Sequence, residues 1–237
     1  MSQKAVITGA TKGIGRAVAE KFCRQGYDLA VCSRNVQDLV DLKKELEDRY
    51  PQREVWIHPC DITKQEDIII WCNKLLQHWD RFEILFNNAG TFLPGTILTE
   101  PEESLMIQMQ TNVFSAYYFT RLLYPMLKKN VNGHIFNLCS IASKKAYANG
   151  GAYAMSKFAI YGFSQCLREE LKPTSIKVTS VLPGATWSDS WTTSSFGPED
   201  MIQANDIAEL LWTCSQLSKQ GVVEEILIRP QGGGFVD

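Results

Sequence analysis

Tyr153 and Lys157 are the residues whose types and spacing most directly suggest proton transfer. They stand four positions apart in a segment with a helical pattern, so both side chains lie on one helix face. A free tyrosine has a pKa of about 10 and transfers protons poorly near neutral pH. A nearby ammonium group favours the phenolate and lowers that pKa. The pair is therefore a candidate acid/base group, although a tyrosine that only packs could have the same spacing.

A glycine-rich turn near the N-terminus predicts a phosphate-binding loop. It connects an apolar run at residues 5–8 to a helical pattern. Glycines let backbone amides approach a pyrophosphate, and the helix dipole favours the anion. Because the flanking strand and helix both agree, we expect a bound dinucleotide rather than an incidental turn. The candidate binding residues in this turn are Gly9, Thr11, Lys12, Gly13, Ile14 and Gly15.

The end of the second predicted strand indicates which dinucleotide binds. A dinucleotide site usually places an acidic residue about 20 residues after the glycine turn, on the ribose 2′-hydroxyl. This chain has Ser33 and Arg34 there, and Lys12 lies in the glycine turn near the same corner. Two cations without a carboxylate suit a 2′-phosphate. The sequence thus predicts NADP(H) rather than NAD(H); the alternative is that both cations are solvated surface residues.

Strand-like and helix-like segments alternate along the whole chain. Apolar runs predict strands at residues 5–8, 29–32, 55–58, 84–86, 134–138, 176–181 and 225–228. Amphipathic patterns predict one helix from Ile14 to before Gly26, and others at residues 36–46, 66–79 (capped by Thr63), 102–129, 152–171 and 204–216. This alternation predicts the α/β class: a doubly wound, parallel seven-stranded sheet flanked by helices, in a single domain over residues 1–237.

Composition excludes several classes of protein. The 237 residues carry a formal charge of −2, which leaves no basic footprint for nucleic acid. No apolar run is long enough for a transmembrane helix, and the N-terminus lacks the apolar stretch of a signal peptide. The seven cysteines form no CxxC pair and the three histidines show no ligand spacing, so we expect reduced thiols and no metal site. These features predict a cytoplasmic protein.

Several motifs together resemble the short-chain dehydrogenase/reductase family, whose members have a Rossmann fold. The similarity covers essentially the whole chain, with the motifs in the family's order and spacing. They are the glycine turn at residues 8–15, Asn87-Asn88-Ala89-Gly90, Asn112, Ser140, Tyr153 with Lys157, and Pro183-Gly184. The C-terminal residues 224–230 look more like the sepiapterin-reductase and serine-dehydrogenase branches than like oxoacyl-carrier-protein reductases.

The resemblance implies a role for each matching residue. Tyr153 would exchange a proton with the substrate oxygen, and Ser140 would hydrogen-bond the same oxygen. Lys157 would bind the nicotinamide ribose and lower the pKa of Tyr153, while Asn112 would order a water behind the lysine. Asp61 would meet the adenine amino group. The further residues expected to contact the cofactor are Ile62, Asn88, Ala89, Gly90, Pro183, Gly184, Thr186 and Ser188.

The segment at about residues 185–203 is where this family places its substrate loop. Its aromatic side chains are Trp187, Trp191 and Phe196, and further expected lining residues are Phe92, Ile141, Tyr147 and Met155. These predict a substrate with an apolar or aromatic part; the alternative is that the aromatics only anchor the loop. Asp189 receives no role.

Two helices carry apolar residues on more than one face: the one around residues 106–126 and the one that contains Tyr153. Family members commonly pair through these helices, so we expect a homodimer or homotetramer. The function expected is an NADP(H)-dependent oxidoreductase of the carbonyl reductase or alcohol dehydrogenase type, acting on a small-molecule carbonyl or alcohol. The alternatives are an NADP(H)-binding sensor on the same fold and an epimerase or dehydratase, against which the short chain argues.

Overall fold

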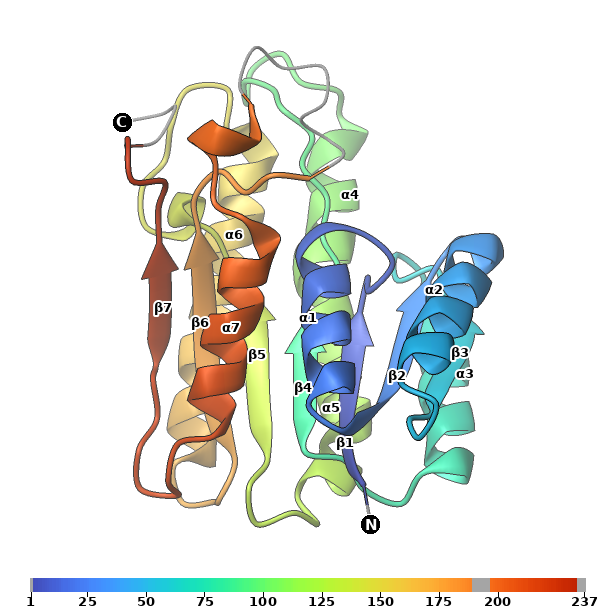
Figure 1. The fold of residues 1–237 in the computed structure, drawn as a ribbon. Coiled ribbons are helices and arrows are strands. Elements are labelled where there is room, and N and C mark those ends of the chain that lie inside the picture. The colour runs from blue at the N-terminus through green and yellow to red at the C-terminus, as the bar shows by residue number, and fades with distance from the viewer. Residues whose placement is uncertain (1, 189–196, 234–237) are drawn as a thin grey trace.

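A parallel sheet of seven strands forms the centre of the molecule (Figure 1). The computed structural model describes residues 2–188 and 197–233. The strand order is β3-β2-β1-β4-β5-β6-β7, and all neighbours pair in parallel. The strands are β1 (Gln3–Thr8), β2 (Tyr27–Ser33), β3 (Val55–Pro59), β4 (Ile84–Asn87), β5 (His134–Leu138), β6 (Lys177–Pro183) and β7 (Glu225–Ile228). The predicted fold class is confirmed.

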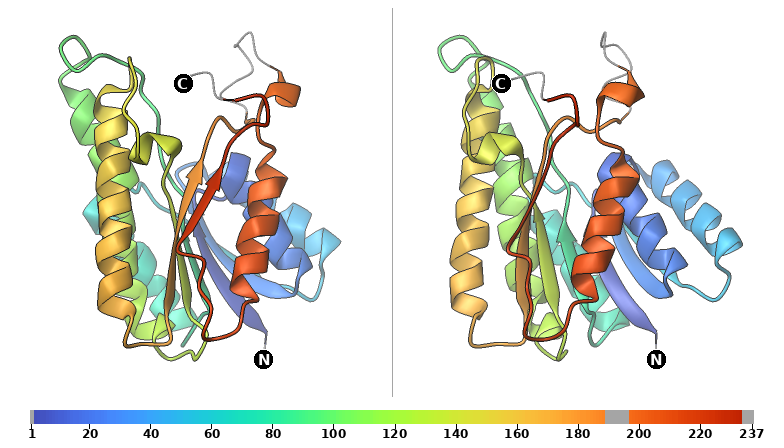
Figure 2. Two further views of the ribbon diagram at one scale, coloured as in Figure 1. Left: turned by 90° about the vertical axis from the view of Figure 1, so that its left-hand side faces the viewer. Right: turned by 60° about the vertical axis from the view of Figure 1, so that its left-hand side comes forward.

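Helices cover both faces of the sheet, as Figure 2 shows. On one face α1 (Gly13–Arg24), α2 (Val36–Arg49) and α7 (Ala204–Ser215) enclose a core around Phe22, Leu39 and Leu211. On the other face α3 (Gln65–His78), α5 (Ser115–Leu127) and α6 (Gly151–Leu171) enclose cores that include Trp71, Phe119 and Ile160. Strands buried on both sides explain the continuous apolar runs in the sequence.

The helix expected at residues 102–129 is interrupted. It consists of α4 (Glu103–Met109), one π-helical turn (Gln110–Phe114) and α5. A π turn is rare and is frequently found at functional sites. This turn contains Asn112, which is a predicted catalytic residue.

The predicted cap of α3 is wrong. Lys64 occupies the N-cap position and makes no side-chain cap, and the helix begins at Gln65. The Thr63 hydroxyl instead donates to the Asp61 carboxylate over 2.8 Å, and the Thr63 amide donates to it over 3.2 Å. Thr63 therefore closes a turn before α3 rather than capping it.

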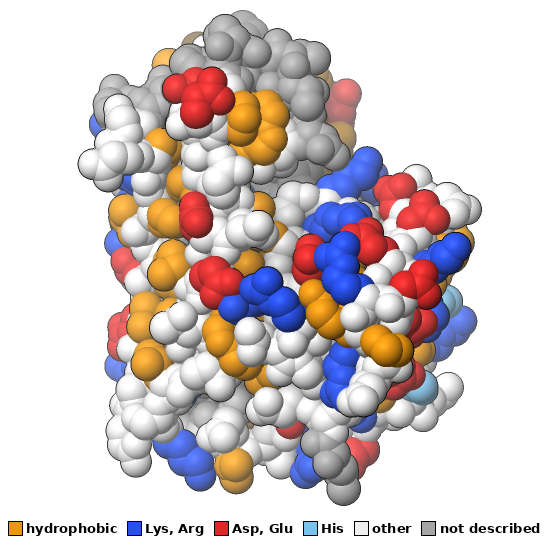
Figure 3. Space-filling model, viewed as in Figure 1, with side chains coloured by type: hydrophobic (Ala, Val, Ile, Leu, Met, Phe, Trp, Pro, Cys, Tyr) orange, Lys and Arg blue, Asp and Glu red, His pale blue; other side chains and the backbone are white. Residues whose placement is uncertain are grey.

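Ion pairs connect the outer surfaces of α1 and α2, where Figure 3 shows positive and negative side chains intermingled. Arg16 pairs with Glu45, and Arg49 pairs with Glu20 and Glu45.

Over the part of the chain that the structure describes, no helix combines the length and apolar character needed to cross a membrane.

Candidate functional site

A cavity of about 1020 Å³ lies at the carboxyl ends of the central strands. Because parallel strands end at one edge of the sheet, segments distant in sequence meet there. The cavity brings together most of the predicted site residues. Those that line it are Gly9, Lys12, Gly13, Ile14, Ser33, Arg34, Ile62, Asn88, Ala89, Gly90, Ser140, Tyr153, Lys157, Pro183, Gly184, Thr186 and Ser188.

Four predicted site residues do not line this cavity: Thr11, Gly15, Asp61 and Asn112. The Thr11 hydroxyl lies 3.4 Å from that of Ser33, and Asp61 accepts hydrogen bonds from Thr63. Both adjoin residues that do line the cavity. Gly15 and Asn112 contact residues near the cavity: Gly15 packs against Gly9 and Asn88, and Asn112 donates hydrogen bonds to Thr91 and Ser156.

The expectations for the substrate pocket have mixed outcomes. Phe92, Ile141 and Tyr147 line the cavity as expected. Met155 does not, because it lies on the outward face of α6 with 47% of its surface exposed. Trp187 does not line the cavity either; its amide donates to Ile202 across the base of the loop. Trp191, Phe196 and Asp189 lie outside the described residues.

The glycine turn packs directly against the segment that follows β4. The Asn88 amide group donates to the carbonyl oxygens of Thr8 and Gly9, both over 2.9 Å. The Thr8 hydroxyl accepts from the backbone amides of Asn88 and Ala89 over 3.1 and 3.0 Å. A Cβ atom on Gly15 would overlap Gly9 O and Asn88 Nδ2, so glycine is required there. These contacts fix the turn from which α1 begins.

Two cations stand where the sequence predicts a 2′-phosphate. Lys12 and Arg34 are both exposed at the cavity, and Ser33 lines the same cavity. Lys12 Nζ lies 3.9 Å from Asp38 Oδ2, an exposed pair that holds the lysine only weakly. Burial raises the pKa of the nearby Asp61, but hydrogen bonds from Thr63 and the charges of Lys64 and Arg34 outweigh it, and the pKa is lowered overall. Asp61 is thus an anion, and Lys64 Nζ lies 3.6 Å from its carboxylate.

Tyr153 lies in the first turn of α6, beside Ser140. Ser140 follows β5 and caps a short helix, with its hydroxyl accepting from the Ala142 amide over 3.1 Å. Burial raises the pKa of Tyr153, and the hydrogen bond with the Ser140 side chain acts in the opposite direction. The rings of Phe92 and Tyr153 pack in a T-shaped arrangement, with 4.8 Å between their centroids. This hydroxyl pair faces the cavity in a largely apolar surrounding.

Lys157 is buried one helical turn after Tyr153. Its ammonium donates to the Leu138 carbonyl over 2.9 Å and lies 5.7 Å from the tyrosine ring centroid. Burial lowers the pKa of Lys157 from 10.5 to about 8. The sequence predicts a lowered pKa for Tyr153; the structure has it raised, because burial outweighs the other influences on the phenol.

Asn112, within the π turn, connects two other segments of the chain. Its side-chain nitrogen donates to Thr91 O over 3.0 Å and to Ser156 Oγ over 2.9 Å, and its side-chain oxygen accepts from the Thr91 amide over 2.7 Å. Ser156 in turn donates to Tyr153 O over 2.7 Å. The side chain of Asn112 is thus a brace between the segment after β4 and the helix of Tyr153. That it orders a water remains a prediction.

The sequence did not identify nine residues that line the cavity. They are Cys32, Cys60, Thr63, Thr91, Pro94, Ile107, Thr111, Leu138 and Cys139. Several directly follow a strand or a recognised motif, which is the signal that could have identified them. Cys139 packs near Lys157; burial raises the pKa of its thiol to about 12, while the lysine charge acts in the opposite direction. It is therefore an unreactive neutral thiol.

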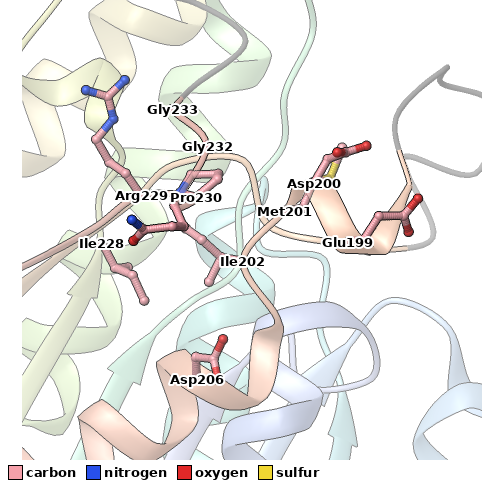
Figure 4. A pocket seen from close by; sticks show the side chains of 11 residues that line it. Glu199, Asp200, Met201, Ile202, Asp206, Ile228, Arg229, Pro230, Gly232 and Gly233 are labelled. Carbon is pink, nitrogen blue, oxygen red and sulfur yellow. The ribbon is translucent and has the colours of Figure 1, made fainter.

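A second, smaller cavity of about 380 Å³ lies between residues 199–206 and the C-terminal residues 228–233 (Figure 4). Its lining includes the carboxylates of Glu199, Asp200 and Asp206. None of the predicted catalytic or cofactor residues line it. Within residues 2–188 and 197–233 no cluster of His, Cys, Asp and Glu side chains could hold a metal ion.

Replacing the buried Lys157 with methionine tests its charge state. The Lys157 ammonium loses its proton at about pH 8 in the folded protein and at about pH 10.5 in the unfolded chain. Burying the charged lysine therefore destabilises the fold fully below pH 8, and this destabilisation disappears as the pH rises to 10.5. That cost is roughly 3 kcal/mol at neutral pH. We expect Lys157→Met to raise the free energy of unfolding at pH 7, and to raise it by less at pH 9.5. Urea unfolding should show these two gains differing by more than about 1 kcal/mol.

The exposed Lys129→Met variant is the matched control, and its effect on unfolding should not change between these pH values. A pH-independent effect of Lys157→Met would contradict a shifted lysine.

Comparison with known proteins identifies the family. The family model described as short chain dehydrogenase matches residues 3–196. A sepiapterin reductase of Chlorobaculum tepidum is 30% identical, with 98% of each chain covered. A metagenomic short-chain oxidoreductase solved with NADP superposes with a TM-score of 0.84 at 28% identity, and an alcohol dehydrogenase of Thermococcus sibiricus solved with 5-hydroxy-NADP with 0.88 at 26%, each covering 97% of both chains. The chain belongs to the short-chain dehydrogenase/reductase family of oxidoreductases.

Proposed function

We propose that this protein is an NADP(H)-dependent oxidoreductase that interconverts a small-molecule carbonyl and its alcohol. The observation that carries the proposal is the hydroxyl pair of Tyr153 and Ser140, which faces the same cavity as the glycine turn and the buried Lys157. A proton donor and a second hydrogen-bond donor aimed at one point are what a carbonyl oxygen needs as negative charge develops on it.

The cavity residues fit a phosphorylated dinucleotide. The glycine turn and the start of α1 offer backbone amides to a pyrophosphate, and Lys12 is the N-cap residue without a side-chain cap of its own. Lys12 and Arg34 supply positive charge at the adenosine end, with Ser33 as a hydroxyl partner. Lys157 and Tyr153 hold the opposite end. The solved relatives that carry NADP or a derivative of it support the same preference.

A bound nicotinamide supplies the hydride in reduction and accepts it in oxidation. During reduction Tyr153 donates its phenolic proton to the substrate oxygen, and the raised pKa keeps that proton in place at neutral pH. Ser140 holds the same oxygen by a hydrogen bond. The Lys157 ammonium stabilises the phenolate left behind, and Asn112 keeps α6 in position through Ser156. We propose reduction as the working direction.

The substrate proposed has an apolar or aromatic part. Phe92, Ile141 and Tyr147 line the cavity near Tyr153. Burial raises the pKa of Tyr147 to about 12, so this side chain stays neutral at physiological pH. Residues 185–203 are proposed as the substrate loop, with the described residues Ala185, Thr186 and Ser188 on the cavity wall.

We also propose that the protein is a cytoplasmic homodimer or homotetramer. Large apolar side chains remain exposed at the helices that carry the site: Phe114, Tyr117 and Phe158 are each at least 40% exposed. Such a patch is typical of a surface that binds another protein. A second copy would cover it and stiffen the helix that holds Tyr153.

Tyr153→Phe tests the proton donor. The variant should bind NADPH as the wild type does but lose about 10²–10⁴-fold in kcat/KM, because general acid catalysis contributes that much. The assay follows NADPH consumption with diketones, aromatic aldehydes, β-keto esters and pterins. Tyr124→Phe, on α5 and outside the lining of the cavity, is the matched control and should keep most activity.

Turnover by Tyr153→Phe at the wild-type rate would contradict the proposed role. A wild type that binds NADPH tightly and reduces nothing would favour a sensor instead.

Arg34→Asp tests the cofactor preference. Removing charge-assisted hydrogen bonds to the 2′-phosphate should raise the NADPH dissociation constant about 10- to 100-fold. The NADH constant should change little, because NADH has no 2′-phosphate. Fluorescence titration with both cofactors measures the two constants.

Lys44→Asp makes the same charge change on the exposed surface of α2 and should leave both constants near their wild-type values. An unchanged NADPH dissociation constant in Arg34→Asp would contradict the proposed binding of the 2′-phosphate by Arg34.

A further inference from the structure

Glu100 reaches from the segment after β4 to the start of α6. Its carboxylate accepts the Ala152 amide hydrogen with both oxygens, over 3.1 and 3.3 Å. A short turn presents this side chain: the amides of Thr99 and Glu100 both donate to Thr96 O, over 3.0 and 2.8 Å. The contact joins residues that lie 52 positions apart in the sequence.

The start of α6 needs such a partner. The first amides of a helix have no acceptor within it, and a side chain at the N-cap normally provides one. Here the N-cap residue is Gly150, which has no side chain to offer. A carboxylate also complements the positive end of the helix dipole. Glu100 therefore caps α6 from outside the helix.

The backbone segments on either side of this contact lie too close together for a side chain at position 151. Gly151 has φ of +29°, and a Cβ atom there would lie 2.5 Å from Gly95 O and 2.6 Å from Glu100 Oε2. Gly95 donates its amide hydrogen to Asn149 O over 3.1 Å. The segment 95–100 and the first turn of α6 are thus packed as one unit.

We infer that Glu100 is a positioning residue for the proposed reaction, which this inference presupposes. Tyr153 directly follows the capped Ala152, so the cap sets where the phenol lies relative to Ser140. The segment that carries Glu100 also carries Phe92, whose ring contacts Tyr153. The hydrogen bonds of the Glu100 carboxylate end at the Ala152 amide and not at Tyr153. Glu100 therefore acts through the backbone, on the position of Tyr153 and on that of Phe92.

The test compares Glu100→Ala and Glu100→Gln in the full-length protein. Glu100→Ala should lower kcat about tenfold or more, since small misplacements of catalytic groups are costly. Its NADPH dissociation constant should stay within about twofold of the wild-type value, because the proposed phosphate-binding loop is formed by other segments. Glu100→Gln should restore most of kcat, since its side-chain oxygen accepts the same hydrogen. The exposed Glu102→Ala is the matched control and should behave as the wild type.

Hydrogen exchange supplies a second readout. The amides of residues 150–156 should exchange faster in Glu100→Ala than in the wild type or in Glu100→Gln, well below the melting temperature of each variant. Measuring kcat at such temperatures separates positioning from stability, because all variants are then folded.

Wild-type kcat in Glu100→Ala would overturn the inference. So would a Glu100→Gln variant that is as slow as Glu100→Ala while its exchange remains normal. If Glu100→Ala does not fold, Glu100→Asp replaces it, because the shorter side chain draws the carboxylate away from the Ala152 amide. Wild-type kcat and wild-type exchange in Glu100→Asp would then overturn the inference. A wild type that reduces no carbonyl overturns the proposed function itself, which distinguishes that failure from the failure of Glu100.

Discussion

The site depends on the parallel pairing of β1 with β4, the point at which the strand order reverses. The chain builds β1, β2 and β3 outward in one direction and then returns to place β4 on the other side of β1. The segments that leave the ends of β1 and β4 must diverge, and a crevice opens between them. The register that sets Ile7 beside Phe86 brings Thr8 to Asn88, whose hydrogen bonds close the base of that crevice. This pairing fixes the position of the glycine turn, because the turn follows β1 and packs against Asn88 after β4.

Burial then determines the charge states of the groups around the crevice. The phenol of Tyr153 and the ammonium of Lys157 both sit in surroundings that disfavour charge, so the phenol pKa rises and the lysine pKa falls. The phenol of Tyr153 is consequently protonated at neutral pH. The lysine stays close to its titration range, so a small change in its surroundings alters its charge. Perturbed pKa values of this kind cluster at functional sites.

Most of the fold follows from the sequence because its signals are local. Apolar runs mark the strands, amphipathic stretches mark the helices, and motifs in register mark the ends of β1, β4 and β5. The π turn at Asn112 could not be predicted, because one extra residue per turn barely disturbs the apolar pattern of a helix. Thr63 has a good capping residue type, and only the position of Asp61 explains why its hydroxyl is used elsewhere. The cap of α6 by Glu100 joins residues 52 apart, so no local pattern could reveal it.

Tyr153 stands in the first turn of its helix, the part that by itself would be least rigid, because the first amides have no partner within the helix. Two contacts from outside α6 compensate for this weakness. Glu100 holds the amide of Ala152, and Asn112 holds Ser156, which bonds back to Tyr153 O. Both contacts come from the chain between β4 and α5, and the same stretch supplies Phe92 to the cavity wall. The chain between β4 and α5 therefore forms one wall of the cavity and also holds the helix that carries the proposed acid/base residue.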